Sequence, residues 1–257
     1  MSADYAMLDR AGASELIFYP RPDYEPAPPG ASDHLIEVAA GVAIAARWYA
    51  FDASYPTILY FHGNGEIASD HDSIAPLYRD AGANLFVAEF RGYGRSNGRP
   101  AFAHLVADAH PVAERFHMLL DGGGFSQRRF IMGRSLGSHP ALELAARAPG
   151  RFRGLIVESG AAGLRRMLER FGLNAEEGPA AELVAAHEAK IRSIGLPLLV
   201  IHGEYDELIP LEHALELYDL LAAVERELVV IPGAGHNDLL WGGRRQYFEA
   251  IRAFVNR

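Results

Sequence analysis

A serine stands between two glycines where an apolar, strand-like run passes directly into a helix-like stretch. Residues 130–139 read FIMGRSLGSH, in which Gly133 and Gly137 bracket Ser135 in a Gly-x-Ser-x-Gly pattern. At a turn of this kind the glycines let the backbone close up, and the serine is held out in a strained conformation. The pattern predicts that Ser135 is a nucleophile; the alternative is a serine in an ordinary glycine-flanked turn.

A serine hydroxyl needs a base to take its proton, and the base needs a buried acid to orient it. In open α/β sheets, functional groups gather beyond the carboxyl ends of the strands, so the candidates lie just after apolar runs. Asp206 follows the run at 198–202, and His236 follows the run at 228–231. The chain order serine, aspartate, histidine is the one this strand arrangement produces. We therefore expect Asp206 to be the acid and His236 to be the base.

Other side chains compete for these two roles. Glu158 ends an apolar run of its own and is the main alternative acid. Three more carboxylates near the candidate loops are interpreted as solvated charges: Glu204, Glu207 and Asp238. Six histidines in helix-like or polar stretches are interpreted as surface or packing residues: His71, His104, His110, His117, His187 and His213.

Acyl transfer by a serine also needs two N–H donors for the oxyanion of the transition state. Leu136 follows the serine at the start of the predicted helix, so its N–H is one candidate. The turn at 62–65 reads HGNG and follows the apolar strand 57–61, and its glycines would let backbone amides face a ligand. We expect the Asn64 N–H to be the second donor; the alternative is a turn needed only for chain reversal.

Strands and helices alternate along most of the chain. Strands are expected at 35–39, 42–50, 57–61, 84–90, 129–132, 154–158, 198–202 and 228–231, and helices near 73–81, 102–119, 141–147 and 239–255. This order predicts an α/β fold with a mostly parallel, twisted sheet of about eight strands and helices on both faces.

The length and a hydrophobic content of 49% suit one large core, so a single domain spanning 1–257 is expected. Residues 1–30 end in proline-rich stretches that exclude regular structure, which predicts an arm laid over the domain. The segment 160–194, after the sixth strand, is longer than a crossover needs and shows helical spacing. It is either a small cap over the site or a set of crossover helices packed on the sheet.

Composition excludes several classes of partner and site. The net charge of −9 and the absence of basic runs argue against nucleic acid or an anionic membrane surface as a partner. The lack of cysteine excludes disulfides, thiolate metal sites and a cysteine nucleophile.

The N-terminal residues do not resemble a signal peptide and no apolar stretch is long enough to span a bilayer, so a cytoplasmic location is expected. The glycines at 92 and 94 are not a dinucleotide fingerprint, because position 97 is asparagine.

The chain resembles the α/β-hydrolase superfamily along nearly its whole length after the arm, and five stretches carry the resemblance most specifically. They are 62–65, 90–96, 133–137, 202–206 with Pro210, and 233–238. Together they are similar to the small serine-hydrolase branch that includes depalmitoylase-like proteins. The resemblance implies esterase or thioesterase chemistry by Ser135, Asp206 and His236, with no cofactor and no metal.

The substrate pocket is expected on the helical side of the serine. His139 departs from the small residues usual beside the elbow in that branch, and it would narrow or polarise the pocket. Leu164, Leu168 and Phe171 are spaced by four and three residues, so they share one helix face. They would cover an acyl chain if the insertion is a cap, and they would be ordinary core if it packs on the sheet.

The leading hypothesis is a hydrolase that cleaves a small-molecule acyl ester or thioester through an acyl-enzyme intermediate. An amidase or peptidase of the same mechanism is a second hypothesis, and it requires His236 to protonate an amine leaving group. A third is a ligand-binding protein on a hydrolase scaffold with a silent triad. The presence of all three catalytic residue types argues against the silent scaffold, since a binding protein does not need them.

Overall fold

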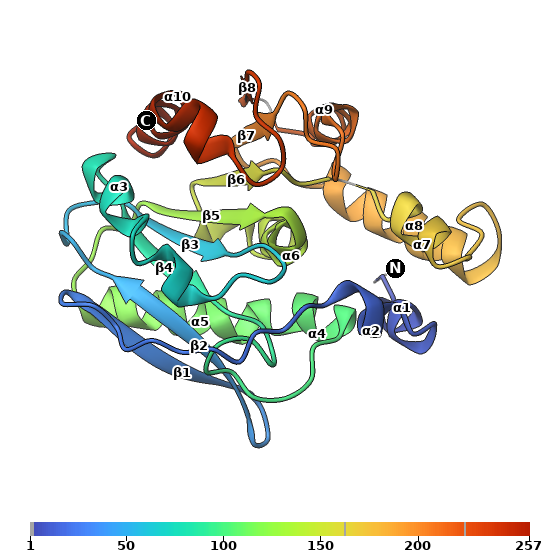
Figure 1. The fold of residues 1–257 in the computed structure, drawn as a ribbon, viewed down its shortest axis with the longest axis horizontal. Coiled ribbons are helices and arrows are strands. Elements are labelled where there is room, and N and C mark those ends of the chain that lie inside the picture. Colours follow the sequence, from blue (N-terminus) through green and yellow to red (C-terminus); the bar gives the residue numbers. More distant parts are fainter. Residues whose placement is uncertain (1–2, 162, 224) are drawn as a thin grey trace.

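The computed structural model describes residues 3–161, 163–223 and 225–257. The first two residues of the predicted arm and position 162 of the predicted insertion lie outside the described residues. Figure 1 shows a central sheet with helices on either side. The strands within the described ranges are β1 (Ala31–Ala39), β2 (Val42–Tyr49), β3 (Thr57–Phe61), β4 (Asn84–Ala88), β5 (Arg129–Arg134), β6 (Gly154–Glu158), β7 (Leu198–Gly203) and β8 (Arg226–Ile231).

These strands form one sheet in the order β1-β2-β4-β3-β5-β6-β7-β8. The pairs β1–β2 and β2–β4 are antiparallel. Every other neighbouring pair, from β4 across to β8, is parallel. The prediction of a mostly parallel sheet of about eight strands is therefore confirmed, and the carboxyl ends of β3 to β8 meet along one edge.

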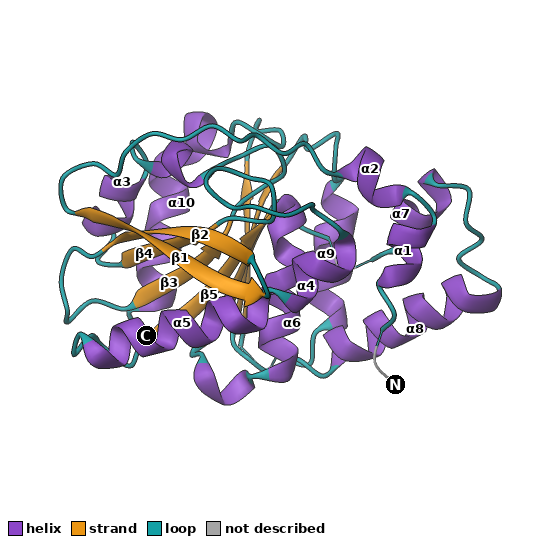
Figure 2. Cartoon of the chain, turned by 90° about the horizontal axis from the view of Figure 1, so that it is seen from below, coloured by secondary structure: helices purple, strands orange, loops and turns teal. Residues whose placement is uncertain are grey.

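Helices cover both faces of the sheet, as predicted. The α-helices within the described ranges are α1 (Ala6–Arg10), α2 (Ala13–Ile17), α3 (Ala75–Asp80), α4 (Phe102–Ala107), α5 (Ala109–Gly122), α6 (Ser138–Arg147), α7 (Arg165–Arg170), α8 (Gly178–Arg192), α9 (Leu211–Leu220) and α10 (Leu239–Val255). The insertion after the sixth strand is confirmed, since α7 and α8 lie between β6 and β7. Figures 1 and 2 both place these two helices beside α1 and α2 at one end of the molecule.

Two apolar clusters fill the two sides of the sheet, and β5 contributes to both. Ile131 belongs to the cluster under α5 and α6, whereas Phe130 and Met132 belong to the cluster under α3 and α10. Successive side chains of a strand point to opposite faces, so Arg134 points to the same side as Phe130 and Met132. Figure 2 shows α3 and α10 on the opposite side of the strands from α5.

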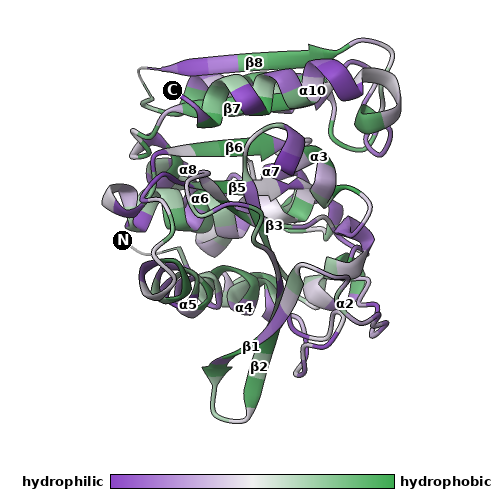
Figure 3. Ribbon diagram, turned by 90° about the vertical axis from the view of Figure 1, so that its left-hand side faces the viewer, coloured by the Kyte–Doolittle hydropathy of each residue, from purple (hydrophilic) through white to green (hydrophobic). Residues whose placement is uncertain are grey.

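Strand β8 ends the sheet at one edge. In Figure 3 its first residues are hydrophilic and its last residues hydrophobic. Arg226 is exposed, whereas Ile231 is fully buried. A charged residue on an edge strand disfavours pairing with another chain, which is consistent with the sheet ending here.

The expectation that 1–30 holds no regular structure was wrong for the first half of that segment. The helices α1 and α2 form there, separated by Gly12 at φ 74°. Leu8 and Ala13 are both fully buried, so the two short helices are held by packing. The prolines that exclude helix begin only at Pro20, and their effect does not reach the preceding residues.

The single helix predicted at 102–119 is two helices, α4 and α5, which meet at Asp108. Pro111 lacks the N–H that would donate to the Ala107 carbonyl four residues earlier, so the helical ladder is interrupted at this junction. The predicted helix 239–255 matches α10 at both ends.

The turn between β5 and α6 has no room for a side chain at either of its glycines. A Cβ on Gly133 would collide with the Gly137 carbonyl, and a Cβ on Gly137 would collide with the carbonyl oxygens of Phe61 and His62. Between the glycines, Ser135 has φ 50°, which is uncommon for a residue with a side chain. The turn therefore packs backbone against backbone at the end of β3.

Gly137→Ala should destabilise the protein, because the atoms that its Cβ would meet belong to the backbone and cannot rotate away. Overpacking of this kind costs about 1–3 kcal/mol, which corresponds to roughly 2–4 °C in Tm per kcal/mol for a chain of this size. Thermal unfolding of the variant measures the loss. Gly122→Ala is the control, since no heavy atom lies within 4 Å of the added Cβ and alanine is the better helix former. Equal Tm values for the two variants would contradict the packing constraint.

Candidate active site

The structure brings Ser135, His236 and Asp206 into one hydrogen-bonded chain. Ser135 follows β5, Asp206 follows β7 and His236 follows β8, so all three lie at the carboxyl edge of the sheet. His236 Nε2 is 3.0 Å from Ser135 Oγ, and His236 Nδ1 is 2.7 Å from Asp206 Oδ2. Each residue ends up where the sequence predicted it, after its own parallel strand.

Asp206 is buried and held by its own loop. Its Oδ1 accepts N–H bonds from Leu208 at 3.0 Å and Ile209 at 2.7 Å. Burial disfavours the charged form, but the hydrogen bonds from His236 and Ile209 outweigh it and lower the pKa of the carboxyl. An ionised Asp206 accepts the Nδ1–H of His236, which leaves Nε2 as an acceptor for the Ser135 hydroxyl.

His202 is a contact of Asp206 that sequence reasoning missed. Its Nε2 lies 2.7 Å from the Ile209 carbonyl and 3.4 Å from Asp206 Oδ2. Burial lowers the pKa of His202, so the neutral ring donates to the Ile209 carbonyl and fixes the loop that carries Asp206. The available signal was its position as the last residue of the predicted strand before the acid.

The competing carboxylates are engaged elsewhere or exposed. Glu158 accepts from Arg134 Nε at 3.2 Å and from the Tyr247 hydroxyl at 2.8 Å. Glu204 Oε2 accepts the Gly233 N–H at 2.9 Å. Asp238 binds the Gly235 N–H, and Glu207 is exposed. The carboxylate in contact with His236 Nδ1 is therefore that of Asp206.

The two predicted oxyanion donors lie on backbone segments that touch. Leu136 is in the 3-10 turn Ser135–Gly137, whose last glycine packs against the carbonyls at the end of β3. Asn64 lies three residues beyond β3, and its side chain is firmly held. Its Oδ1 accepts from the Tyr93 hydroxyl at 2.6 Å and from the Tyr19 N–H at 3.0 Å.

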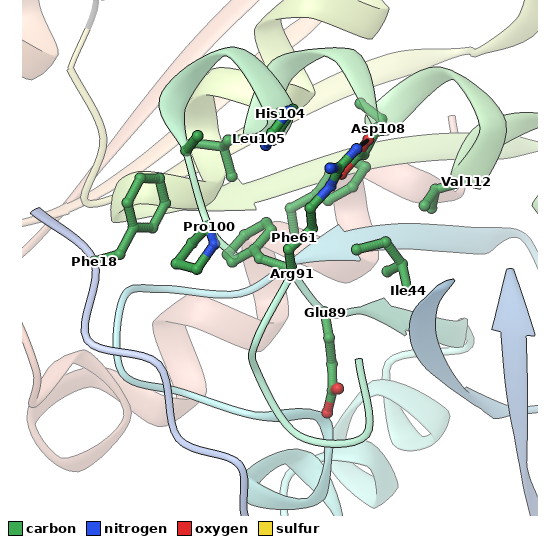
Figure 4. Close-up of a pocket in the computed structure, with 13 residues that line it drawn as sticks. Phe18, Ile44, Phe61, Glu89, Arg91, Pro100, His104, Leu105, Asp108 and Val112 are labelled. Atoms are coloured by element: carbon green, nitrogen blue, oxygen red, sulfur yellow. Dashed lines mark hydrogen bonds and ion pairs between the residues drawn. The ribbon is translucent and has the colours of Figure 1, made fainter. Parts of the chain in front are cut away.

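The N-terminal arm completes this side of the site. Asn64 Nδ2 donates to the Ile17 carbonyl at 2.5 Å, so two arm residues, Ile17 and Tyr19, bind the Asn64 side chain. Between them Phe18 is buried and lines a small pocket with Phe61 and Leu105. Figure 4 shows Phe18 reaching into this pocket from the arm. The arm is therefore anchored beside the turn at 62–65.

Three of the four predicted pocket residues, Leu164, Leu168 and His139, are more buried than a cap over an open site requires. Leu164 and Leu168 are 1% and 0% exposed and belong to the larger apolar cluster, whereas Phe171 is partly buried and packs against it. His139 is buried, and the centroid of its ring lies 4.8 Å from the centroid of the Phe102 ring. Burial and then the charge of Lys190 lower the pKa of His139 to about 3, so the ring is neutral.

Arg134 is a second residue near the proposed triad that sequence reasoning missed, and it contacts the loop that carries His236. Its Nη2 donates to the His236 carbonyl at 2.9 Å and to Asn237 Oδ1 at 2.8 Å. Its Nη1 pairs with Glu66, and its Nε pairs with Glu158. The sequence signal was the alternation along β5, which directs Arg134 to the side of the sheet where α10 begins.

The part of the chain that the structure describes bears on two further features, metal sites and membrane spans. No group of three or more histidine, aspartate or glutamate side chains is arranged there to hold a metal ion. No helix in the same ranges is long and apolar enough to cross a membrane.

The chain is similar to known hydrolases in sequence and in fold. Residues 53–176 match the family model described as serine aminopeptidase, S33. The human alpha/beta hydrolase domain-containing protein 17B is 32% identical over 78% of this chain and 66% of its own length. Protein bem46 of Schizosaccharomyces pombe is 29% identical over 79% of this chain and 68% of its own. The chain thus spans about two thirds of the length of these relatives.

A solved structure of the Pyrococcus furiosus esterase Pf2001 has the same fold, with a TM-score of 0.72 and 20% identity over 94% of this chain and 97% of that one. On the sequence matches and the fold together, the chain belongs to the α/β-hydrolase superfamily.

Proposed function

We propose that the protein is a serine hydrolase that cleaves carboxylic esters or thioesters of a small-molecule acyl substrate. The observation that carries the proposal is the continuous chain from Ser135 through His236 to Asp206, with heavy-atom separations of 3.0 and 2.7 Å. Both separations lie within the reach needed for proton transfer and for orienting the base. In this proposal 1–257 is one hydrolase domain, with 1–30 as its arm and 160–194 as its insertion.

Ser135 Oγ attacks the acyl carbon while His236 Nε2 takes the hydroxyl proton. The charged imidazole is stabilised by the Asp206 carboxylate at Nδ1. The C–O or C–S bond then breaks, the leaving group takes the proton from Nε2, and an acyl ester of Ser135 remains. Water repeats the sequence with His236 as the base, which releases the acid and restores the serine.

The N–H groups of Asn64 and Leu136 are the proposed donors to the oxyanion. Both belong to backbone segments that the contact between Gly137 and the end of β3 holds together. Donors fixed before the reaction need no reorganisation as the negative charge forms, and one such donor contributes about 2.7–4 kcal/mol to lowering the barrier.

Two kinds of scissile bond are to be distinguished, the ester or thioester bond and the amide bond. The Pyrococcus furiosus neighbour is named an esterase, which supports ester cleavage. The family model is described as serine aminopeptidase, which supports the amidase alternative. A screen of chromogenic acyl esters, thioesters and aminoacyl anilides of graded chain length tests both on one preparation. Turnover of anilides alone would replace the esterase proposal, and turnover of none would favour a silent scaffold.

Ser135→Ala should abolish ester hydrolysis and leave the fold intact, because the change removes only a hydroxyl. Steady-state assays measure the loss, and circular dichroism checks the fold. A fluorophosphonate should label the wild-type protein on the peptide that contains Ser135, and mass spectrometry identifies that peptide. Near wild-type turnover by the variant would remove Ser135 from the mechanism.

Asp206→Asn should lower kcat by roughly 10⁴-fold, the scale seen when the acid of a serine triad loses its charge. Glu158→Gln is the matched control, since it makes the same change in a buried carboxylate that binds Arg134 and Tyr247. It should lower kcat far less. The reverse ranking would assign the acid to Glu158.

Of the predicted pocket residues, Phe171 is the proposed contact of the acyl chain, because Leu164 and Leu168 are buried in the core. Phe171→Ala should then flatten the dependence of kcat/KM on chain length, which is about fourfold per methylene if each contributes ~0.8 kcal/mol. Leu168→Ala should instead reduce the free energy of unfolding by about 2–5 kcal/mol and leave that dependence unchanged. An unchanged chain-length profile in Phe171→Ala, with a large loss of stability, would make the insertion ordinary core.

A further inference from the structure

The guanidinium of Arg134 joins three segments of the chain at the carboxyl edge of the sheet. Glu66, which binds Nη1, follows the turn of the proposed oxyanion donor. Glu158, which binds Nε at 3.2 Å, ends β6. The His236 carbonyl and Asn237, which accept from Nη2, lie in the loop after β8. One side chain thus meets segments that are separated by more than 150 residues of sequence, from Glu66 to Asn237.

Glu66 extends this connection to the oxyanion turn itself. Its Oε2 accepts the Gly63 N–H at 3.0 Å, while its Oε1 pairs with Arg134. Gly63 is packed so closely that a Cβ there would collide with Arg134 Nη1. The guanidinium therefore lies directly against the backbone next to Asn64 as well as under the loop of His236.

The guanidinium of Arg134 is chemically suited to joining these segments. Arg134 is the residue immediately before the nucleophile, so its backbone shares the geometry of the elbow. A planar guanidinium offers five N–H donors in a fixed fork, whereas a lysine offers one compact charge. Arg134 is 11% exposed, and its donors meet two carboxylates, one carbonyl and one amide oxygen. An ammonium group cannot satisfy that set of acceptors in one position.

We infer that Arg134 is a positioning residue that sets the His236 ring and the turn at 62–65 relative to Ser135. The inference rests on the proposed hydrolase function and adds a residue outside the Ser135, His236 and Asp206 set. Arg134 does not touch the reacting atoms. It acts through the His236 carbonyl on one side and through Glu66 on the other.

The chain supplies a matched control in Arg47. Its side chain is 2% exposed and also binds two carboxylates, Asp33 and Asp72, together with the Glu25 carbonyl. It belongs to β2, on the antiparallel side of the sheet, and none of its partners is a residue of the proposed site. Substituting either arginine leaves two carboxylates, buried or partly buried, without their cation, so both sets of variants should lose stability.

Arg134→Lys and Arg134→Ala are compared with Arg47→Lys and Arg47→Ala at a temperature where all four are folded. Arg134→Ala should lower kcat about 10²-fold, the cost of misplacing a catalytic group by ~1 Å, and KM should change little. Arg134→Lys should fall between it and the wild type. The Arg47 variants should keep the wild-type kcat. Equal kcat losses at the two arginines, or none at Arg134, would overturn the inference.

Chemical rescue separates positioning from a general loss of packing. A cavity of about 240 Å³ borders Arg134 and His236 and would admit a small cation. Guanidinium ion at non-denaturing concentration should restore part of the kcat of Arg134→Ala and none of the activity of Ser135→Ala. Failure of guanidinium to raise kcat, with the variant folded, counts against positioning.

A spectroscopic readout does not depend on turnover. The Nδ1 proton of His236, bonded to Asp206, should give a proton resonance far downfield of the amides in the wild type. That resonance should shift or broaden in Arg134→Lys and stay in place in Arg47→Lys. An inactive wild type that a fluorophosphonate does not label would sink the proposed function, and an unmoved resonance in Arg134→Lys would separately sink the role of Arg134.

Discussion

The site depends on the absence of space between the β5–α6 turn and the end of β3. At Gly137 the nearest atoms to a built Cβ are the carbonyls of Phe61 and His62, so backbone meets backbone there. Ser135 is held at φ 50°, a conformation that costs of order 1–3 kcal/mol and persists only where its surroundings determine it. With the serine fixed in this way, the acid and the base need only be brought to it by loops that leave neighbouring parallel strands.

Next to the proposed triad, two carboxylates, Glu66 and Glu158, pair with one cation, Arg134. Burial raises the pKa of Glu158, and the Arg134 charge opposes the shift without cancelling it. For Glu66 burial also opposes ionisation, but the Arg134 charge, together with His71, His62 and the Gly63 N–H, outweighs burial and lowers the pKa. A buried pair of this kind contributes little net stability, because desolvation offsets the attraction. Its effect is geometric, since the guanidinium has a single position in which all of its acceptors are met.

Much of this arrangement could be predicted from the sequence, and the parts that could not share a physical reason. The strands buried on both faces are continuous apolar runs, such as 198–201, and the chain order of Ser135, Asp206 and His236 follows from the order of those strands. The helices α1 and α2 have five residues each, too few for helical periodicity to show. The contacts of Arg134 span 68 residues to Glu66 and 103 to Asn237, and no local pattern encodes such pairs.

The arm, which the prolines predicted to be an irregular segment laid over the domain, is part of the structure around the site. At one end the Tyr5 hydroxyl accepts from the buried Lys190 of α8 at 2.5 Å, and Lys190 also pairs with Glu143 of α6 at 2.8 Å. A buried cation needs several acceptors to offset its desolvation, so Tyr5 belongs to the core around it. At the other end the arm binds the Asn64 side chain through Ile17 and Tyr19. One continuous segment therefore sets the position of the insertion and of the proposed oxyanion turn together.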